Sequence, residues 1–513
     1  MLRVLFGQSY YMRFDPKEWQ GMKPYPPLGT LYAAAYVRQR GYDVRFFDSM
    51  LAHSEQEWQA ALEEHRPDVA VIYEDSFNYL SKMCLTRMRQ AAFVMAEAAR
   101  AMGCVVLVSG SDATDHKEKY FAHGVDAIIV GEGEITLAET LDYLSKHLKQ
   151  PNRQLDANRT KIAGLAWPDA PNPIPRGYIK NLDQLPFPAW DLVDVAKYRK
   201  VWLERHGYYS MNMVTTRGCP YHCNWCAKPI YGQRYNVRSP ENVAAELRWL
   251  KDRYAPDHIW FADDIMGLKP GWIERFADEV HKLDAVTPFK CLLRVDLIKP
   301  GIPEALRKAG CEIVWVGAES GSQKILDAMD KGTRVEQIYA AARNLHAAGI
   351  KVGFFLQFGY PGETRADIEA TLKMVRDCEP DDIGVSVSYP LPGTKFYENV
   401  RQQLGEKQNW LDSGDLAMMY RGPYSTHFYR KLHTVLHKEF RARKIWRALR
   451  SGGVRRPVGR VLHDAAYMAY NWLTLPVERW RLDRLAARSE QGLGPLPPIM
   501  TPEAAATPSA QPD

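Results

Sequence analysis

The sequence predicts an α/β protein in which a doubly wound parallel sheet precedes a partial (β/α)6 barrel and a helical C-terminal extension. Short β-branched apolar runs alternate with helical patterns up to about residue 147, and six further strand-plus-helix units begin near residue 211. The chain has 513 residues, of which 46% are hydrophobic and 25% charged. These values indicate two or three folded units and exclude wholesale disorder, collagen and a disulfide scaffold.

We expect the first domain over residues 1–148. Its sequence alternates five apolar runs with four helical patterns, which is the order of a doubly wound sheet. Ligands of such sheets bind beyond the carboxyl ends of the strands. The expected strands are 2–6, 42–47, 68–73, 104–109 and 126–130, and the expected helices are 29–40, 55–65, 83–102 and 135–148.

Residues 149–207 contain several prolines and little periodicity, so we expect an irregular linker there. The partial barrel is expected over residues 208–400, with its chemistry at the carboxyl ends of the strands. The expected barrel strands are 211–216, 258–262, 289–294, 312–316, 352–358 and 383–388, and the expected helices are 240–254, 271–283, 303–309, 334–348 and 364–378.

Residues 401–490 are expected to form a basic helical extension, and residues 491–513 a disordered tail. Between residues 430 and 488 there are fifteen Lys or Arg against four Asp or Glu. A solvated helical surface is the simplest interpretation, and contact with a membrane surface through 465–480 is the alternative, although Pro476 is expected to interrupt that helix. We expect no nucleic-acid partner, because no basic-aromatic module is present.

The N-terminal residues and the eight cysteines indicate the cellular compartment in which the protein works. No run approaches eighteen apolar residues, and the first fifteen residues lack the pattern of a secretory signal, so we expect a cytoplasmic protein. Three of the cysteines fall within eight residues, and the other five are scattered singly. In the absence of a secretory signal, such a cluster indicates a metal-binding or catalytic role rather than disulfides.

The clustered cysteines are Cys219, Cys223 and Cys226, spaced C-x3-C-x2-C directly after an apolar strand. Iron–sulfur clusters favour thiolate ligands, and three thiolates on a four-iron cluster leave one iron open. Structural zinc with His222 as the fourth ligand is the alternative. It is disfavoured because His222 and Cys223 are adjacent and no second pair completes a familiar zinc spacing.

This loop resembles the signature of the radical S-adenosylmethionine (SAM) superfamily, C-x3-C-x-aromatic-C, with Trp225 in the aromatic place. The resemblance implies that the three cysteines hold a 4Fe-4S cluster, that SAM chelates the open iron, and that Trp225 contacts SAM. It also implies SAM contacts at the ends of later strands, although Asp-Asp replaces the better-known Gly-Gly-Glu and each residue is also an ordinary rim residue. These residues are Asp263, Asp264, Arg294, Glu319 and Ser320. No catalytic residue is assigned.

The first domain lacks both the G-x-G-x-x-G fingerprint and a phosphate loop. Its segments 24–36 and 130–134 resemble the cobalamin-binding domain that precedes the barrel in cobalamin-dependent radical SAM enzymes. Residues 7–20 contain no histidine, so the resemblance implies a cobalt without a protein histidine ligand. Tight turns alone are the other interpretation of the glycines. The implied cobalamin contacts are Ser76, Ser109, Gly110, Gly131 and Gly133.

The resemblance as a whole implies an enzyme that cleaves SAM to a 5′-deoxyadenosyl radical and methylates an unactivated carbon of a small molecule. An oxidative cyclase of the anaerobic Mg-protoporphyrin IX monomethyl ester cyclase type is the alternative, and a non-catalytic iron–sulfur or zinc-binding protein is an alternative of another class. The implied cofactors are a 4Fe-4S cluster, SAM and cobalamin. A reductant such as flavodoxin or ferredoxin is the expected protein partner.

Overall fold

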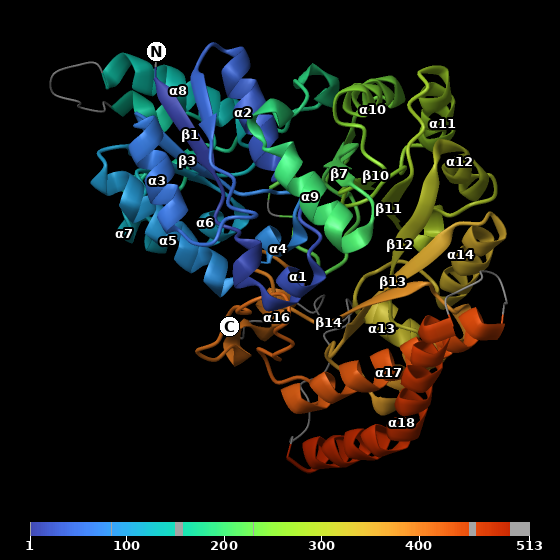
Figure 1. Ribbon diagram of the computed structural model, residues 1–513. Helices are drawn as coiled ribbons and strands as arrows, with labels where there is room; N and C mark the ends of the chain where they lie inside the picture. Colours follow the sequence, from blue (N-terminus) through green and yellow to red (C-terminus); the bar gives the residue numbers. More distant parts are fainter. Residues whose placement is uncertain (1, 84, 149–156, 229, 451–457, 493–513) are drawn as a thin grey trace, which may run out of the picture.

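The computed structural model describes residues 2–83, 85–148, 157–228, 230–450 and 458–492. Two six-stranded sheets lie side by side, and a pair of long helices is attached at one end of the molecule (Figure 1). The predicted disordered tail lies outside the described residues, apart from residues 491 and 492, which end the last helix.

The N-terminal sheet has the strand order β2-β1-β3-β4-β5-β6, with all neighbours parallel except the last pair. The order reverses between β1 and β3, which is where ligands of such sheets bind. The strands are β1 (Arg3–Gly7), β2 (Asp43–Phe46), β3 (Val69–Tyr73), β4 (Val105–Ser109), β5 (Ala127–Ile129) and β6 (Leu165–Ala166).

Helices cover both faces of this sheet, because successive residues of each buried strand point to opposite sides. In β3, Val69 and Val71 pack on the α2 and α8 side, whereas Ala70 and Ile72 pack on the α3, α5 and α7 side. The helices are α1 (Pro16–Gly21), α2 (Leu28–Gln39), α3 (Gln56–His65), α4 (Tyr79–Lys82), α5 (Thr86–Ala101), α6 (Ser111–Asp115), α7 (Lys117–Ala122) and α8 (Glu134–His147).

The second sheet is parallel throughout and runs in chain order from β7 to β14, as an open partial barrel. Its strands are β7 (Ser210–Met213), β10 (His258–Phe261), β11 (Phe289–Leu293), β12 (Cys311–Glu319), β13 (Lys351–Phe358) and β14 (Asp382–Val387). Its helices are α10 (Pro240–Tyr254), α11 (Trp272–Lys282), α12 (Ile302–Ala309), α13 (Gln323–Ala328), α14 (Val335–Ala347), α15 (Arg365–Cys378) and α16 (Lys395–Val400).

The prediction of an irregular linker over 149–207 was wrong for part of that segment. It contributes β6 to the N-terminal sheet and forms the twelve-residue helix α9 (Val195–His206). Asp194 caps the start of α9, and Gly207 ends it in a left-handed conformation. Only Tyr198 and Trp202 of this helix are buried, so its apolar stripe is too narrow to be recognised from periodicity.

The C-terminal extension is a helical pair, α17 (Thr426–Arg450) and α18 (Val458–Gly492). The predicted interruption at Pro476 was wrong, because α18 continues through that residue. Long helices tolerate the one hydrogen bond that proline removes when packing against a neighbour holds both halves. Among the described helices, none combines the length and the apolar character that crossing a membrane requires.

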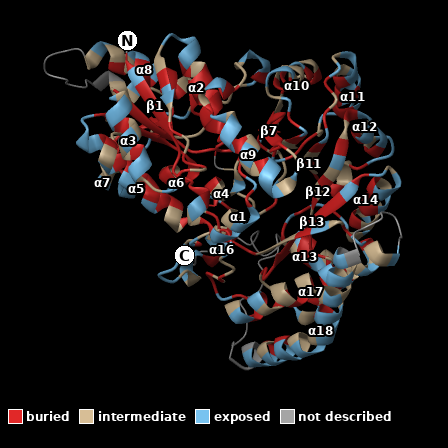
Figure 2. Ribbon diagram, in the orientation of Figure 1, coloured by how far each residue is buried: buried red, intermediate tan, exposed pale blue. Residues whose placement is uncertain are grey.

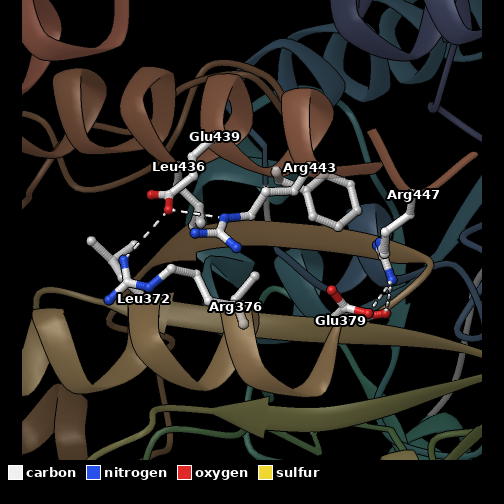
Figure 3. Close-up of a pocket in the computed structure, with 9 residues that line it drawn as sticks. Leu372, Arg376, Glu379, Leu436, Glu439, Arg443 and Arg447 are labelled. Atoms are coloured by element: carbon white, nitrogen blue, oxygen red, sulfur yellow. Dashed lines mark hydrogen bonds and ion pairs between the residues drawn. The ribbon is translucent and has the colours of Figure 1, made fainter. Parts of the chain in front are cut away.

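A buried carboxylate fixes this pair to the barrel (Figure 3). Glu439 of α17 lies beside a small cavity between α15 and α17 and is only 4% exposed. Three arginines pair with it: Arg376 of α15 at 3.6 Å, Arg443 at 3.3 Å and Arg479 of α18 at 2.7 Å. One carboxylate therefore ties together three helices from two parts of the chain.

We predict that Glu439→Ala lowers the free energy of unfolding by about 2 kcal/mol, because three half-buried arginines lose their counter-charge. Thermal unfolding followed by circular dichroism measures the change. Glu398→Ala is the matched control, since its pair with Arg401 is more than half exposed on both sides and should contribute less than about 0.5 kcal/mol. Equal effects of the two variants would contradict the docking role of Glu439.

Candidate functional site

The three clustered cysteines lie in a loop at the carboxyl end of the first barrel strand, β7. The loop is closed at its base by two short antiparallel strands, β8 (Thr216–Arg217) and β9 (Asn236–Val237). Between β8 and the first cysteine, Gly218 has φ +79°, and a Cβ there would lie 2.5 Å from the carbonyl oxygen of Arg234. Only glycine fits both the conformation and the space, so this residue sets the entry into the loop.

Asn224 anchors the turn between the second and third cysteines. Its backbone N–H donates to the carbonyl of Met329 at 3.0 Å, and its side-chain NH2 donates to the carbonyl of Ala328 at 2.8 Å. The amide oxygen accepts from the hydroxyl of Tyr360 at 2.9 Å, and the backbone carbonyl accepts from Phe396 N–H at 3.0 Å. The turn is thus fixed to three later barrel units, through a residue that the cysteine motif does not specify.

Positive charge borders the thiols. Arg294 donates to Cys223 Sγ at 3.8 Å and to the carbonyl of Lys331 at 2.9 Å, and Lys331 in turn pairs with Glu319 at 2.9 Å. Glu319 holds φ +56°, an uncommon conformation for a non-glycine residue that the surrounding fold must impose. Burial raises the pKa of the Cys226 thiol to about 12. Arg294 therefore places a guanidinium beside Cys223 Sγ, where it can stabilise a thiolate.

The aromatic residue of the motif, Trp225, packs beside a cluster that contains Tyr360 and Phe396. Its indole N–H is buried and has no partner among the described residues, and Lys331 Nζ lies 5.9 Å from the ring centre. A buried donor without an acceptor is costly, and a bound polar group would satisfy it.

Two other residues predicted to contact SAM, Asp263 and Ser320, form hydrogen bonds within the protein. The carboxylate of Asp263 accepts hydrogen bonds from the backbone and hydroxyl of Thr215, both at 2.6 Å, and from Thr216 N–H at 2.9 Å. Burial raises its pKa to about 6. Ser320 Oγ lies 3.2 Å from Thr371 Oγ1 and accepts from Ser322 N–H at 3.1 Å. These side chains hold the strand ends in place.

Asp264 forms a bridge between the two domains, because it pairs with Lys82 of α4 at 2.5 Å. Close by, Tyr79 of α4 keeps 54% of its surface exposed. No local pattern in the sequence indicates Lys82, because its proximity to the barrel depends on how the domains pack.

A second ionic link between the domains is formed by Arg217, which stands two residues before Cys219. Its guanidinium pairs with Glu132 at 2.5 Å and with Glu134 at 2.6 Å, and the three side chains are 2 to 3% exposed. The rings of Tyr32, Phe77 and Tyr231 surround the guanidinium at 5.1 to 5.8 Å. The cysteine loop is thus joined directly to the carboxyl edge of the N-terminal sheet.

That edge carries unpartnered buried polar groups. Gln8 and Ser9 follow β1 at the reversal point of the sheet and are fully or almost fully buried. Both polar atoms of the Gln8 side chain and the hydroxyl of Ser9 have no hydrogen-bond partner among the described residues. Glu74, after β3, accepts from Ser9 N–H at 3.1 Å, and burial raises its pKa to about 8. Such atoms indicate a place where a ligand completes the hydrogen bonding.

The structure places the five predicted cobalamin contacts on this same edge. Ser76 and Ser109 are buried. A Cβ on Gly110 would lie 2.8 Å from the Glu74 side chain, and one on Gly133 would lie 2.5 Å from the Tyr73 hydroxyl. The backbone at these two glycines therefore lies close against β3 and the loop that follows it. Gly131, with φ +81°, has open space around it.

Comparison with known proteins agrees with this arrangement. Residues 213–375 match the radical SAM superfamily, and residues 23–141 match the B12-binding domain. The chain is a radical SAM enzyme with a B12-binding domain. Its cofactors are a 4Fe-4S cluster, SAM and cobalamin. Among the described residues, no group of three or more His, Cys, Asp or Glu side chains is arranged around a single metal ion, and the three cysteines of the loop are free thiols.

The relatives include methyltransferases and cyclases. An uncharacterized methyltransferase of Pyrococcus horikoshii is 28% identical over 396 residues, which is 75% of this chain and 81% of the relative. An anaerobic magnesium-protoporphyrin IX monomethyl ester cyclase of Rubrivivax gelatinosus is 26% identical over 408 residues, 76% of this chain and 68% of the relative.

Among solved structures, the radical SAM methyltransferase TsrM of Kitasatospora setae, with cobalamin and a [4Fe-4S] cluster bound, aligns with a TM-score of 0.63 at 16% identity. The alignment covers 78% of each chain. The likeness confirms the predicted fold class, an N-terminal sheet domain followed by a partial barrel.

We predict that Arg217→Met lowers the free energy of unfolding of the metal-free protein by about 3 to 5 kcal/mol, because Glu132 and Glu134 stay buried without a counter-charge. Anaerobic urea unfolding measures the loss. Arg275→Met is the matched control, since its pair with Glu241 is exposed on both sides. A loss below about 1 kcal/mol for Arg217→Met would contradict the role given to this interaction.

Proposed function

We propose that this protein is a cobalamin-dependent radical SAM methyltransferase that acts on an unactivated carbon of a small molecule. The observation that carries the proposal is the junction at Arg217. This side chain joins the loop of the three cysteines to Glu132 and Glu134, which follow the last parallel strand of the B12-binding domain. The cysteine loop and the edge of the B12-binding domain, which would hold the two cofactors, are thereby fixed to one another. Methyl transfer that involves both cofactors requires such a fixed arrangement.

Each cofactor has a set of residues suited to it. We assign Cys219, Cys223 and Cys226 as cluster ligands, and Trp225, Arg294 and Glu319 as the border of the SAM site. Gln8, Ser76 and the open turn at Gly131 are assigned to cobalamin. When bound, the cluster and SAM supply a radical that abstracts hydrogen from carbon, and cobalamin supplies the methyl group.

The protein's own residues would position these groups and exclude water. Arg294 holds positive charge 3.8 Å from Cys223 Sγ, which favours the thiolate that iron requires. Asp263 and Asn224 fix the two ends of the loop through hydrogen bonds. Lys82 of α4, from the other domain, pairs with Asp264 at the carboxyl end of the barrel, where a substrate would lie between the cofactors.

Two further assignments complete the proposal. A one-electron reductant such as flavodoxin or ferredoxin supplies the electron for SAM cleavage, and the protein works in the cytoplasm. Both follow from the oxygen-sensitive cluster that three thiolates would hold.

We predict that anaerobically purified Cys226→Ala loses most of the about four irons expected per chain, because three thiolates are needed to hold such a cluster. Iron and sulfide analysis and the visible absorption spectrum measure this loss. Cys378→Ala is the matched control, because Cys378 ends α15 outside the loop and should leave the iron content unchanged. Equal iron in both variants, or stoichiometric zinc in the wild type, would exclude the assignment.

The cyclase activity is the second candidate, favoured by the relative from Rubrivivax gelatinosus. The two reactions differ in the atom added to the product. We predict that deuterium from the SAM methyl group enters the product, and that oxygen from labelled water does not enter Mg-protoporphyrin IX monomethyl ester. Mass spectrometry of anaerobic reactions with reductant measures both. Oxygen incorporation without methyl incorporation would replace the methyltransferase proposal with the cyclase.

A further inference from the structure

The outer face of α18 is apolar over four helical turns. Every exposed residue of this helix from 464 to 480 is uncharged, and the spacing of three and four places them on one side. Leu473 exposes 79% of its surface, Tyr470 and Trp480 55% each, and Val477 47%. The exposed set is Ala466, Ala469, Tyr470, Trp472, Leu473, Pro476, Val477 and Trp480.

The opposite face of α18 fixes this orientation. Leu475, Leu482 and Ala486 are buried in the core shared with α17 and the barrel. Glu478 of the same helix pairs with Lys431 of α17 at 2.6 Å, and Arg479 reaches Glu439. Turning the apolar face inward would break these contacts. Figure 2 shows α18 at the edge of the molecule, with exposed residues along its outer side.

Positive charge lies at the C-terminal end of the apolar face. Arg481, Arg484 and Arg488 are exposed there, and Arg484 lies 4.8 Å from the Trp480 ring centre. The one acid among them, Asp483, is neutralised by Arg365 of α15 at 2.9 Å. The region 430–488 carries fifteen Lys or Arg against four Asp or Glu, whereas the whole chain has a net charge of only +6. The segment that carries the apolar face is therefore strongly positive.

We propose that this face docks on the surface of an anionic lipid bilayer. Apolar side chains enter the headgroup–acyl boundary, Trp and Tyr settle at the interface, and exposed arginines contact lipid phosphates, which is the pattern of an interfacial amphipathic helix. Charge complementarity selects this occupant over a neutral apolar partner. The proposal is independent of the reaction, since it rests on α17 and α18 alone.

Sedimentation of the anaerobically purified holoenzyme with vesicles tests it. Vesicles of mixed phosphatidylglycerol and phosphatidylcholine should bind the protein, and pure phosphatidylcholine vesicles should bind it at least about tenfold more weakly. Raising the salt from about 0.05 M to about 0.5 M should weaken the anionic binding, because screening removes the attraction to phosphates.

Two variants separate the apolar and charged contributions. Leu473→Asp with Val477→Asp should lower binding to the mixed vesicles by about tenfold or more. Arg481→Glu with Arg484→Glu should do the same on mixed vesicles and leave binding to neutral vesicles unchanged. Leu203→Asp is the control, because Leu203 is an exposed apolar residue of α9, outside this face. Unchanged circular dichroism shows that the variants are folded.

Three results would overturn the proposal. The first is wild-type protein that does not sediment with the mixed vesicles. The second is binding that neither pair of substitutions changes. The third is a dimer in analytical ultracentrifugation that Leu473→Asp with Val477→Asp converts to monomer, which would assign the face to a second copy of the chain.

Discussion

The buried guanidinium of Arg217 is the interaction on which the arrangement of this protein depends. A charge removed from water is tolerated only with close counter-charges, and Glu132 and Glu134 supply them from residues 85 and 83 positions away in the chain. Because the three side chains are almost fully buried, neither domain can move away without exposing or unpairing them. The distance between the cysteine loop and the edge of the B12-binding domain is fixed by this constraint.

Buried contacts also fix the conformation of the cysteine loop. Gly218 admits the sharp turn, Asp263 holds the strand end with two backbone N–H groups, and Asn224 binds to later barrel units. These polar groups are buried and hydrogen-bonded to protein, so they act as supports that locate the thiols. Predicted cofactor contacts such as Asp263 and Ser320 turn out to hold the protein together, while Gln8 and Trp225 keep polar atoms without protein partners.

The secondary structure of both sheets was predictable because their strands are buried on two faces and appear as continuous apolar runs. All eleven expected strands correspond to strands of the two sheets. The secondary-structure predictions failed in segments where tertiary contacts outweigh the local sequence pattern. Helix α9 buries only two large side chains, β6 has two residues and depends on β5 for pairing, and α18 passes through Pro476 because α17 supports it.

The sequence by itself determined the chemistry of the site. The spacing of three thiols within eight residues is a local property that does not depend on how the remainder of the chain folds. It also determined the order of the domains, through the periodicity of their strands and helices. Only the tertiary structure decided which buried charges meet, that Asp264 and Lys82 link the domains, and which side of α18 faces outward. These depend on contacts between residues far apart in the chain, which no local pattern encodes.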